Sequence, residues 1–218
     1  MKLSDKAALN AIAPYAAWMA FMFMLPANAA NYALRTAVAS LLLVPFLRSR
    51  RFMLPSFKAV FAGLLAGVAV CVLWVVPEHC GWDWYREWMI LGGLPAEGEA
   101  SPYDPSVCGW PLTLARLVGS AFVIAPIEEI FFRDFLYRRL QRADWQAVDR
   151  RVFDLSAFLW MTALFALEHN RIVVGALAGA AYGLLYMRFG LFSAALAHVI
   201  TNLLLALYVI FTGNWAFW

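Results

Sequence analysis

Charged residues are scarce in this sequence. Asp, Glu, Lys and Arg make up 14% of the 218 residues and hydrophobic residues 64%, whereas a soluble domain has about 25% charged and 45–50% apolar residues. This imbalance excludes an ordinary soluble domain. Seven membrane spans of about 20 residues would use roughly 140 residues, which leaves short loops and no room for a second domain. We therefore expect a single integral-membrane domain over residues 1–218.

Features of several other protein classes are also missing. The chain has no internal repeat, no low-complexity tract and no charge pattern that indicates a nucleic-acid partner. It has three histidines and no His-Glu-x-x-His zinc motif. We expect no metal and no cofactor.

Long apolar stretches dominate what is present. Because backbone polar groups in hydrocarbon must be paired within the chain, stretches of this length predict helices. The sequence thus predicts an all-α, polytopic transmembrane helix bundle with about seven spans, near residues 7–26, 28–47, 59–77, 111–137, 155–169, 172–188 and 191–212. On the sixth stretch, Gly175, Gly179 and Gly183 recur every four residues and predict close packing of a neighbouring helix inside the bundle.

The first stretch has two interpretations. Lys2 and Lys6 precede an apolar run, and Ala27-Asn28-Ala29 resembles a signal-peptide cleavage site. We favour an uncleaved first helix over a signal peptide.

The basic residues are distributed asymmetrically. With a cytoplasmic N-terminus, the inner side holds twelve of the seventeen basic residues, namely Lys2, Lys6, Arg48, Arg50, Arg51, Lys58, Arg138, Arg139, Arg142, Arg150, Arg151 and Arg188. Cytoplasmic loops retain Lys and Arg, so this orientation is predicted. We expect a multi-pass protein of the cell's inner (plasma) membrane.

The connection over residues 78–110 is an acidic, Trp-rich external loop. Its acidic residues are Glu78, Asp83, Glu87, Glu97, Glu99 and Asp104. Trp82, Tyr85, Trp88 and Met89 recur at helical spacing. They predict either a short helix in the outer interface or a loop that packs its aromatics over the bundle mouth.

Two cysteines lie in this external loop. If the outside is oxidising, Cys80 and Cys108 can form a disulfide that joins the outer ends of the third and fourth spans. We predict this disulfide; the alternative is two free thiols.

Two adjacent glutamates mark the first of three polar clusters in the apolar chain. Glu129 and Arg133 stand at i and i+4, in the favoured order for an ion pair. Glu128 lies about 100° around the helix, so it faces another neighbour and is the carboxylate free for chemistry. Charges inside spans are costly and persist where they meet partners, water or a function.

The other two clusters each contain a histidine. His198 and Asn202, at i and i+4, would aim two N–H donors at one point, which suits an oxyanion. His169 lies on a different helix and could exchange a proton near Glu128. Taken singly, such residues are also typical of structural ion pairs and of polar contacts between helices; three complementary clusters favour a site.

Together the three clusters resemble the CAAX protease and bacteriocin-processing (CPBP) family, also called the Abi or Rce1-like family of intramembrane glutamic endopeptidases. The matching motifs are Glu128-Glu129-x-x-x-Arg133, Phe165-x-x-x-His169 and His198-x-x-x-Asn202, within residues 111–212. Further similarity to a bacterial CAAX prenyl protease-related subset, found with exosortase and exopolysaccharide systems, lies in Tyr103-Asp104-Pro105-Ser106, Arg133-Asp134-Phe135-Leu136 and the ending Thr212-Gly213-Asn214-Trp215-Ala216-Phe217-Trp218.

The resemblance implies metal-independent hydrolysis of a peptide bond in a membrane-associated protein or peptide. It implies a water activated between Glu128 and His169, and an oxyanion held by His198 and Asn202, with Glu129 and Arg133 in support. It also suggests exosortase-system proteins as partners, besides the substrate and the lipid bilayer. Two alternatives stay open from the residues themselves: a non-catalytic membrane protein that binds a peptide, such as an immunity or assembly factor, and a proton-coupled transporter.

The predicted spans place the motifs at different depths. At about 1.5 Å per residue, His169 lies roughly 21 Å from Leu155, but His198 only about 10 Å from Leu191. Either the helices tilt strongly, or the fifth span starts later and residues 143–158 run along the inner interface. We favour the later start.

Overall fold

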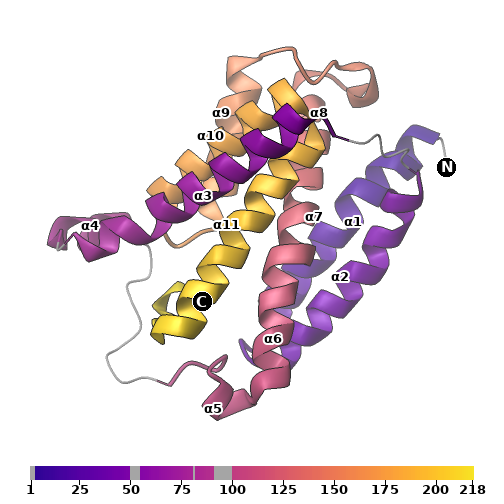
Figure 1. The fold of residues 1–218 in the computed structure, drawn as a ribbon. Coiled ribbons are helices and arrows are strands. Elements are labelled where there is room, and N and C mark those ends of the chain that lie inside the picture. The colour runs from indigo at the N-terminus through magenta and orange to yellow at the C-terminus, as the bar shows by residue number, and fades with distance from the viewer. Residues whose placement is uncertain (1–2, 50–54, 81, 91–99) are drawn as a thin grey trace.

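The computed structural model describes residues 3–49, 55–80, 82–90 and 100–218. Over these residues the chain is helical, and the predicted all-α bundle is confirmed (Figure 1). Lys2, Arg50 and Arg51 of the basic inner side, and Glu97 and Glu99 of the acidic loop, lie outside the described residues. The α-helices are α1 (Leu3–Met24), α2 (Ala29–Ser49), α3 (Phe57–His79), α4 (Asp83–Met89), α5 (Pro105–Cys108), α6 (Trp110–Val118), α7 (Ala125–Glu129), α8 (Tyr137–Gln141), α9 (Leu155–Leu167), α10 (Ile172–Phe189) and α11 (Leu191–Thr212).

Six segments of the described chain are long and apolar enough to cross a membrane. One of them is the continuous rod Trp110–Gln141, in which the π-helical segments η1 (Gly119–Ile124) and η2 (Ile130–Leu136) separate α6, α7 and α8. The fifth predicted stretch forms α9, a helix of 13 residues. At about 1.5 Å per residue α9 is only ~20 Å long, shorter than the hydrocarbon core.

The preferred explanation for the depth mismatch is wrong. Helix α9 begins at Leu155, where the side chain of Asp154 accepts a hydrogen bond from the Ala157 backbone N–H at 2.8 Å. Residues 155–158 are therefore helical, and the preceding connection holds only the short 3₁₀ turn Trp145–Ala147. The helices are inclined to one another (Figure 1), and a strong tilt in the membrane stays a prediction.

The rod Trp110–Gln141 runs between two groups of helices (Figure 1). On one side it packs on α1 and α2, where the rings of Tyr15 and Phe131 stack with centroids 4.0 Å apart. On the other side lie α3, α9, α10 and α11, which share a second apolar core. The polar residues of the rod therefore lie in the interior of the bundle, where the two groups of helices meet.

Helix α3 packs closely on α11 because a glycine stands at the contact. A Cβ atom built on Gly67 would lie 2.6 Å from the Ala197 carbonyl oxygen. The Thr201 hydroxyl donates to the Gly67 carbonyl oxygen at 2.9 Å. This contact fixes the turn of α11 that carries His198.

The glycines of α10 allow the close packing that the sequence predicts. Gly175, Gly179 and Gly183 face α9, where their nearest neighbours include Ala166, Phe165 and Phe158, respectively. The small-residue face is thus buried inside the bundle, against α9.

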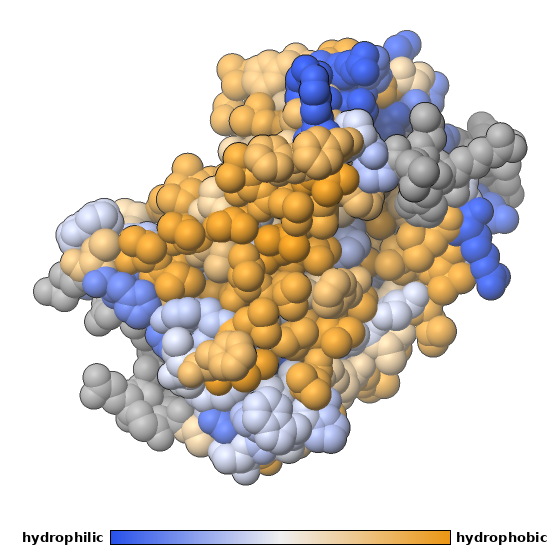
Figure 2. Space-filling model, viewed as in Figure 1, coloured by the Kyte–Doolittle hydropathy of each residue, from blue (hydrophilic) through white to orange (hydrophobic). Residues whose placement is uncertain are grey.

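The outward surface is suited to lipid. Figure 2 shows a broad apolar face over α3 and α11, and hydrophilic residues gathered at the end that carries the N-terminus and α8. Phe57, Phe61 and Leu65 on α3 are all exposed. The described basic residues of the predicted inner side lie near the ends of α1, α2, α3 and α10, in α8, or in the connection after α8.

The external connection contains the predicted short helix, α4. Tyr85 is buried in the core, whereas Trp82 and Trp84 are exposed and stack on each other with centroids 5.7 Å apart. Helix α4 extends sideways from the end of α3 (Figure 1). Of the described aromatics, Tyr85 therefore packs in the core, and Trp82 and Trp84 lie on the surface; the side chain of Trp88 lies outside the described part of the chain.

The predicted disulfide between Cys80 and Cys108 is wrong, because both are free thiols in the structure. Cys80 follows α3, which packs on α11, whereas Cys108 ends α5 beside α6, which packs on α2. The Cys108 sulfur instead lies 3.4 Å from the Thr113 hydroxyl oxygen. The two outer helix ends belong to different halves of the bundle, which sequence proximity to one loop does not reveal.

Candidate active site

The two glutamates lie on the single turn of α7, between the two π-helical segments of the rod. Glu129 is completely buried, and the Glu128 side chain is 12% exposed. Insertions of π-helical geometry occur often at functional sites, where they re-aim side chains. Here they flank the residues that the sequence predicts to carry chemistry.

Glu129 and Arg133 form the predicted ion pair. The Arg133 Nη1 atom lies 3.0 Å from Glu129 Oε1, and both side chains are fully buried. Arg133 also donates through Nη2 to the Gly179 carbonyl oxygen at 3.1 Å, and its guanidinium lies 4.2 Å from the centre of the Phe165 ring. The pair is therefore held by α9 and α10 as well as by its own helix.

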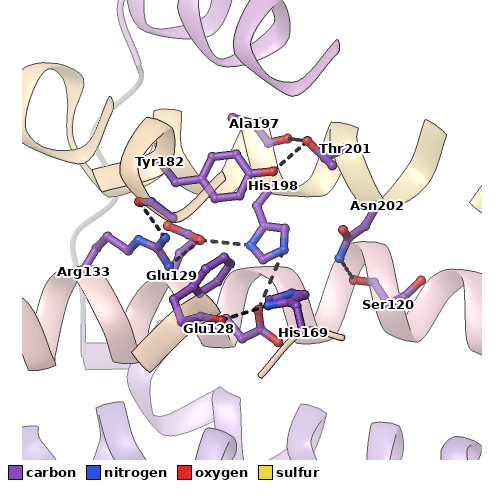
Figure 3. A network of polar contacts seen from close by, with 12 residues as sticks. Ser120, Glu128, Glu129, Arg133, His169, Tyr182, Ala197, His198, Thr201 and Asn202 are labelled. Atoms are coloured by element: carbon purple, nitrogen blue, oxygen red, sulfur yellow. Dashed lines mark hydrogen bonds and ion pairs between the residues drawn. The ribbon is translucent and has the colours of Figure 1, made fainter. Parts of the chain in front are cut away.

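His198 is the third member of this buried cluster. Its Nδ1 atom lies 2.9 Å from Glu129 Oε1. A carboxylate paired with arginine only accepts hydrogen bonds, so Nδ1 carries the proton and donates it. Tyr182 stacks on the imidazole with ring centroids 4.8 Å apart and donates to Thr201 at 2.7 Å. These contacts fix the ring so that Nε2 faces Glu128 (Figure 3).

Glu128 is held far less completely. Its Oε2 atom lies 3.8 Å from His198 Nε2, which is beyond hydrogen-bond distance, and has no hydrogen-bond partner among the described residues. Arg133 pairs with the adjacent glutamate, Glu129, as the helical spacing predicts. Glu129 Oε2 also lacks a hydrogen-bond partner among the described residues, but of the two glutamates only Glu128 lines the cavity.

His169 lies in the connection between α9 and α10. Its Nδ1 atom lies 2.9 Å from the Phe165 carbonyl oxygen. A carbonyl oxygen can only accept, so Nδ1 is the protonated nitrogen and Nε2 keeps a lone pair when the ring is neutral. The edge of the Trp74 ring packs on the imidazole, with centroids 5.3 Å apart. Figure 3 shows the ring beside the Glu128 side chain.

Asn202 differs from the sequence expectation. Its Nδ2 atom donates to the Ser120 carbonyl oxygen at 2.9 Å, and His198 is directed at the glutamates (Figure 3). The Ser120 carbonyl oxygen also accepts the Ala125 backbone N–H of the π-helical segment, so it receives two hydrogen bonds. His198 and Asn202 share a helix face but do not converge on one point in this state.

A cavity of about 400 Å³ connects these side chains. Glu128, His169, His198 and Asn202 all line it, whereas Glu129 and Arg133 do not. In the described part of the chain, no three His, Cys, Asp or Glu side chains are placed to hold a metal ion. The cavity brings together the four residues predicted to be catalytic and leaves the two supporting residues behind them.

Sequence reasoning missed several residues of this site. Tyr182 and Thr201 orient His198, and Glu168 and Arg116 line the cavity. A signal existed for Tyr182, which lies between Gly179 and Gly183 on the face that packs inside the bundle. It also existed for Arg116, a charge inside a predicted span.

The chain was compared with known proteins. Residues 110–204 match the family described as Type II CAAX prenyl endopeptidase Rce1-like. No significant match was found among the curated proteins or the solved structures. The matched segment contains the rod from Trp110 onward and every cavity residue named above as predicted catalytic. Over this segment, which is somewhat less than half of the chain, the protein is similar to the Rce1-like family.

Proposed function

We propose that this protein is an intramembrane endopeptidase that hydrolyses a peptide bond in a membrane-associated protein or peptide of the inner membrane. One observation carries the proposal: Glu128 turns a carboxyl oxygen without a hydrogen-bond partner toward a cavity that two histidines also line. Glu129 also has a buried oxygen without a hydrogen-bond partner among the described residues, but Glu129 does not line the cavity, so only the Glu128 carboxylate can meet a substrate there. The match of residues 110–204 to a family of prenyl endopeptidases supports the same chemistry.

Glu128 acts as the general base for water. A water held between the free Glu128 oxygen and His169 Nε2 loses a proton to the carboxylate as its oxygen attacks the peptide carbonyl carbon. The carbonyl π electrons move to oxygen and return as the C–N bond breaks. The proton taken by Glu128 then passes to the leaving nitrogen, so the enzyme ends in its starting state.

The oxyanion is stabilised by His198 and Asn202. In its doubly protonated form His198 donates Nδ1–H to Glu129 and keeps Nε2–H for the cavity. Asn202 has a second amide hydrogen besides the one that Ser120 accepts. Both donors line the cavity, and substrate binding would have to bring them to the same oxygen.

The supporting pair sets the charge of the site. Arg133 carries one positive charge and Glu129 one negative charge, so the pair is neutral. A neutral total is favourable in a medium of low dielectric. The mechanism uses no metal ion, because Glu128 and the imidazoles supply both proton transfer and oxyanion stabilisation.

The test is hydrolysis in labelled water. The purified protein in lipid nanodiscs is incubated with a library of synthetic apolar peptides in H₂¹⁸O containing a chelator, and products are sequenced by mass spectrometry. We expect new C-termini that carry ¹⁸O, absent with Glu128→Gln and present with the control Glu87→Gln, which changes an exposed side chain on α4. Unlabelled products, or equal cleavage by Glu128→Gln, would contradict the mechanism, and a peptide bound but never cleaved would favour a binding protein.

A further inference from the structure

A second charged side chain reaches the cavity from α6. Arg116 lines the same cavity as Glu128 and Asn202. Its guanidinium carbon lies 3.7 Å from the centre of the Tyr103 ring, 4.5 Å from that of Tyr32 and 5.2 Å from that of Trp218. Three aromatic rings from three separate segments therefore hold this cation at the cavity wall.

Arg116 has no anionic partner within the described part of the chain. It takes part in none of the ion pairs or hydrogen bonds there, and its Nε atom is buried without a partner. Arg133 and Arg171, the arginines that are fully buried in the described part of the bundle, each pair with a glutamate. Aromatic faces attract a cation but leave its N–H donors unused, so the guanidinium keeps its capacity to bind a carboxylate.

A neighbouring arginine adds to the positive potential. Arg35 on α2 lies 4.5 Å from the same Tyr32 ring and is likewise without an ion pair among the described residues. Two cations that share one ring repel each other in a low dielectric. An anion bound at Arg116 would relieve that repulsion, whereas a neutral ligand would not.

The position of Arg116 relates it to the proposed chemistry. Arg116 and Glu128 lie on one continuous rod, twelve residues apart, or ~18 Å along the axis at about 1.5 Å per residue. An extended peptide covers about 3.3 Å per residue. A peptide that binds at both points therefore has its anionic group within about five residues of the bond at Glu128.

We propose that Arg116 is an anion-binding subsite of the cavity that takes a carboxylate of the peptide substrate. Guanidinium and carboxylate match in a bidentate geometry. The carboxylate is either the free C-terminus or an acidic side chain, since both offer the same two oxygens. This inference rests on the proposed function for the identity of the ligand as a peptide.

The test measures binding in a background that cannot cleave. The Glu128→Gln protein in nanodiscs is titrated with three apolar hexapeptides of one sequence: the free acid, its C-terminal amide, and the amide with one glutamate introduced. We expect one of the two carboxylate peptides to bind about tenfold to hundredfold more tightly than the uncharged amide, as charge-assisted hydrogen bonds predict. The peptide that gains affinity identifies the source of the carboxylate.

Two further variants in that background locate the effect. Arg116→Gln should abolish the preference, and Arg188→Gln, at an exposed arginine on the inner end of α10, should keep it. If Arg116→Gln does not fold, Arg116→Lys should reduce the preference severalfold, because it keeps the charge but loses the planar fork. Equal binding of all three peptides, or a preference that survives both Arg116 substitutions, would overturn the subsite. Binding does not require turnover, so failure of hydrolysis would leave this result readable.

Discussion

Two buried glutamate–arginine pairs lie in different regions of this bundle, and their surroundings differ. At the centre, the Glu129–Arg133 pair lies beside a second glutamate whose oxygen opens into a cavity. At the rim of the bundle, Glu78 at the end of α3 pairs with Arg171 before α10. Arg171 also donates to the Ala216 carbonyl oxygen at 3.2 Å and covers the Phe217 ring at 4.2 Å.

The comparison distinguishes charges that stabilise the fold, at the rim, from a charge that is available for chemistry, at the centre. The rim pair ties together three segments that are remote in sequence. Arg171 also lines the cavity, but its guanidinium already binds a carboxylate, a carbonyl oxygen and a ring. The central cluster contains one glutamate, Glu128, in addition to the Glu129–Arg133 pair. A buried polar group that lacks a partner is costly, so its retention beside a cavity indicates a role in binding or catalysis.

After the loss of Glu128, the largest effect is expected from His169→Ala. His169 holds the attacking water in the proposed mechanism, and loss of that positioning should lower turnover by about 10²-fold, whereas its ring contacts mainly Phe165 and Trp74. Turnover should therefore fall while the melting temperature changes little. Added imidazole should restore part of the activity by occupying the space left; a variant that turns over at the wild-type rate would remove His169 from the mechanism.

Arg133→Ala should lower both stability and activity. It leaves Glu129 and His198 buried without the compensating cation, which costs about 3–5 kcal/mol. We expect reduced abundance in the membrane and a lower unfolding midpoint, together with lost turnover. Normal accumulation of an active Arg133→Ala protein would show that the pair does not support the site.

Arg171→Ala should destabilise the protein while sparing its chemistry. Hydrogen bonds to charged groups contribute about 1.5–3 kcal/mol, and Arg171 makes them to Glu78 and Ala216. The midpoint of unfolding should fall, and turnover per folded molecule should stay within a few-fold of wild type. A loss of turnover as large as that of His169→Ala would mean that the rim belongs to the active site.

Thr201→Val should have the smallest effect. It removes the acceptor for Tyr182 and the donor to the Gly67 carbonyl, for a loss of about 1 kcal/mol. The imidazole of His198 should become less well fixed, so kcat should fall modestly with KM unchanged. Tyr182→Phe is the matched variant, since it breaks the same bond from the other side and should give a similar change.

Local spacing predicted the central pair, and long-range packing decided the rest. Glu129 and Arg133 are one helical turn apart, so the sequence alone places them together. Glu78 and Arg171 are joined only by the way α3 and α10 pack, and no periodicity connects them. The partner of Asn202 is a backbone carbonyl in a π-helical segment, and the free state of Cys80 and Cys108 follows from which helices neighbour each other. The short length of α9 is set by Asp154 and by the turn at Glu168, which the apolar run conceals.

The most direct measurement compares the same substitution in the two regions. Glu128→Gln and Glu78→Gln are purified in nanodiscs, and peptide turnover is divided by the folded fraction found by thermal unfolding. Glu128→Gln should remain folded and lose at least about a hundredfold in turnover, whereas Glu78→Gln should melt at a lower temperature and keep its turnover per folded molecule. Near wild-type turnover by Glu128→Gln, or losses that only follow the folded fraction in both variants, would contradict the assignment of the chemistry to Glu128.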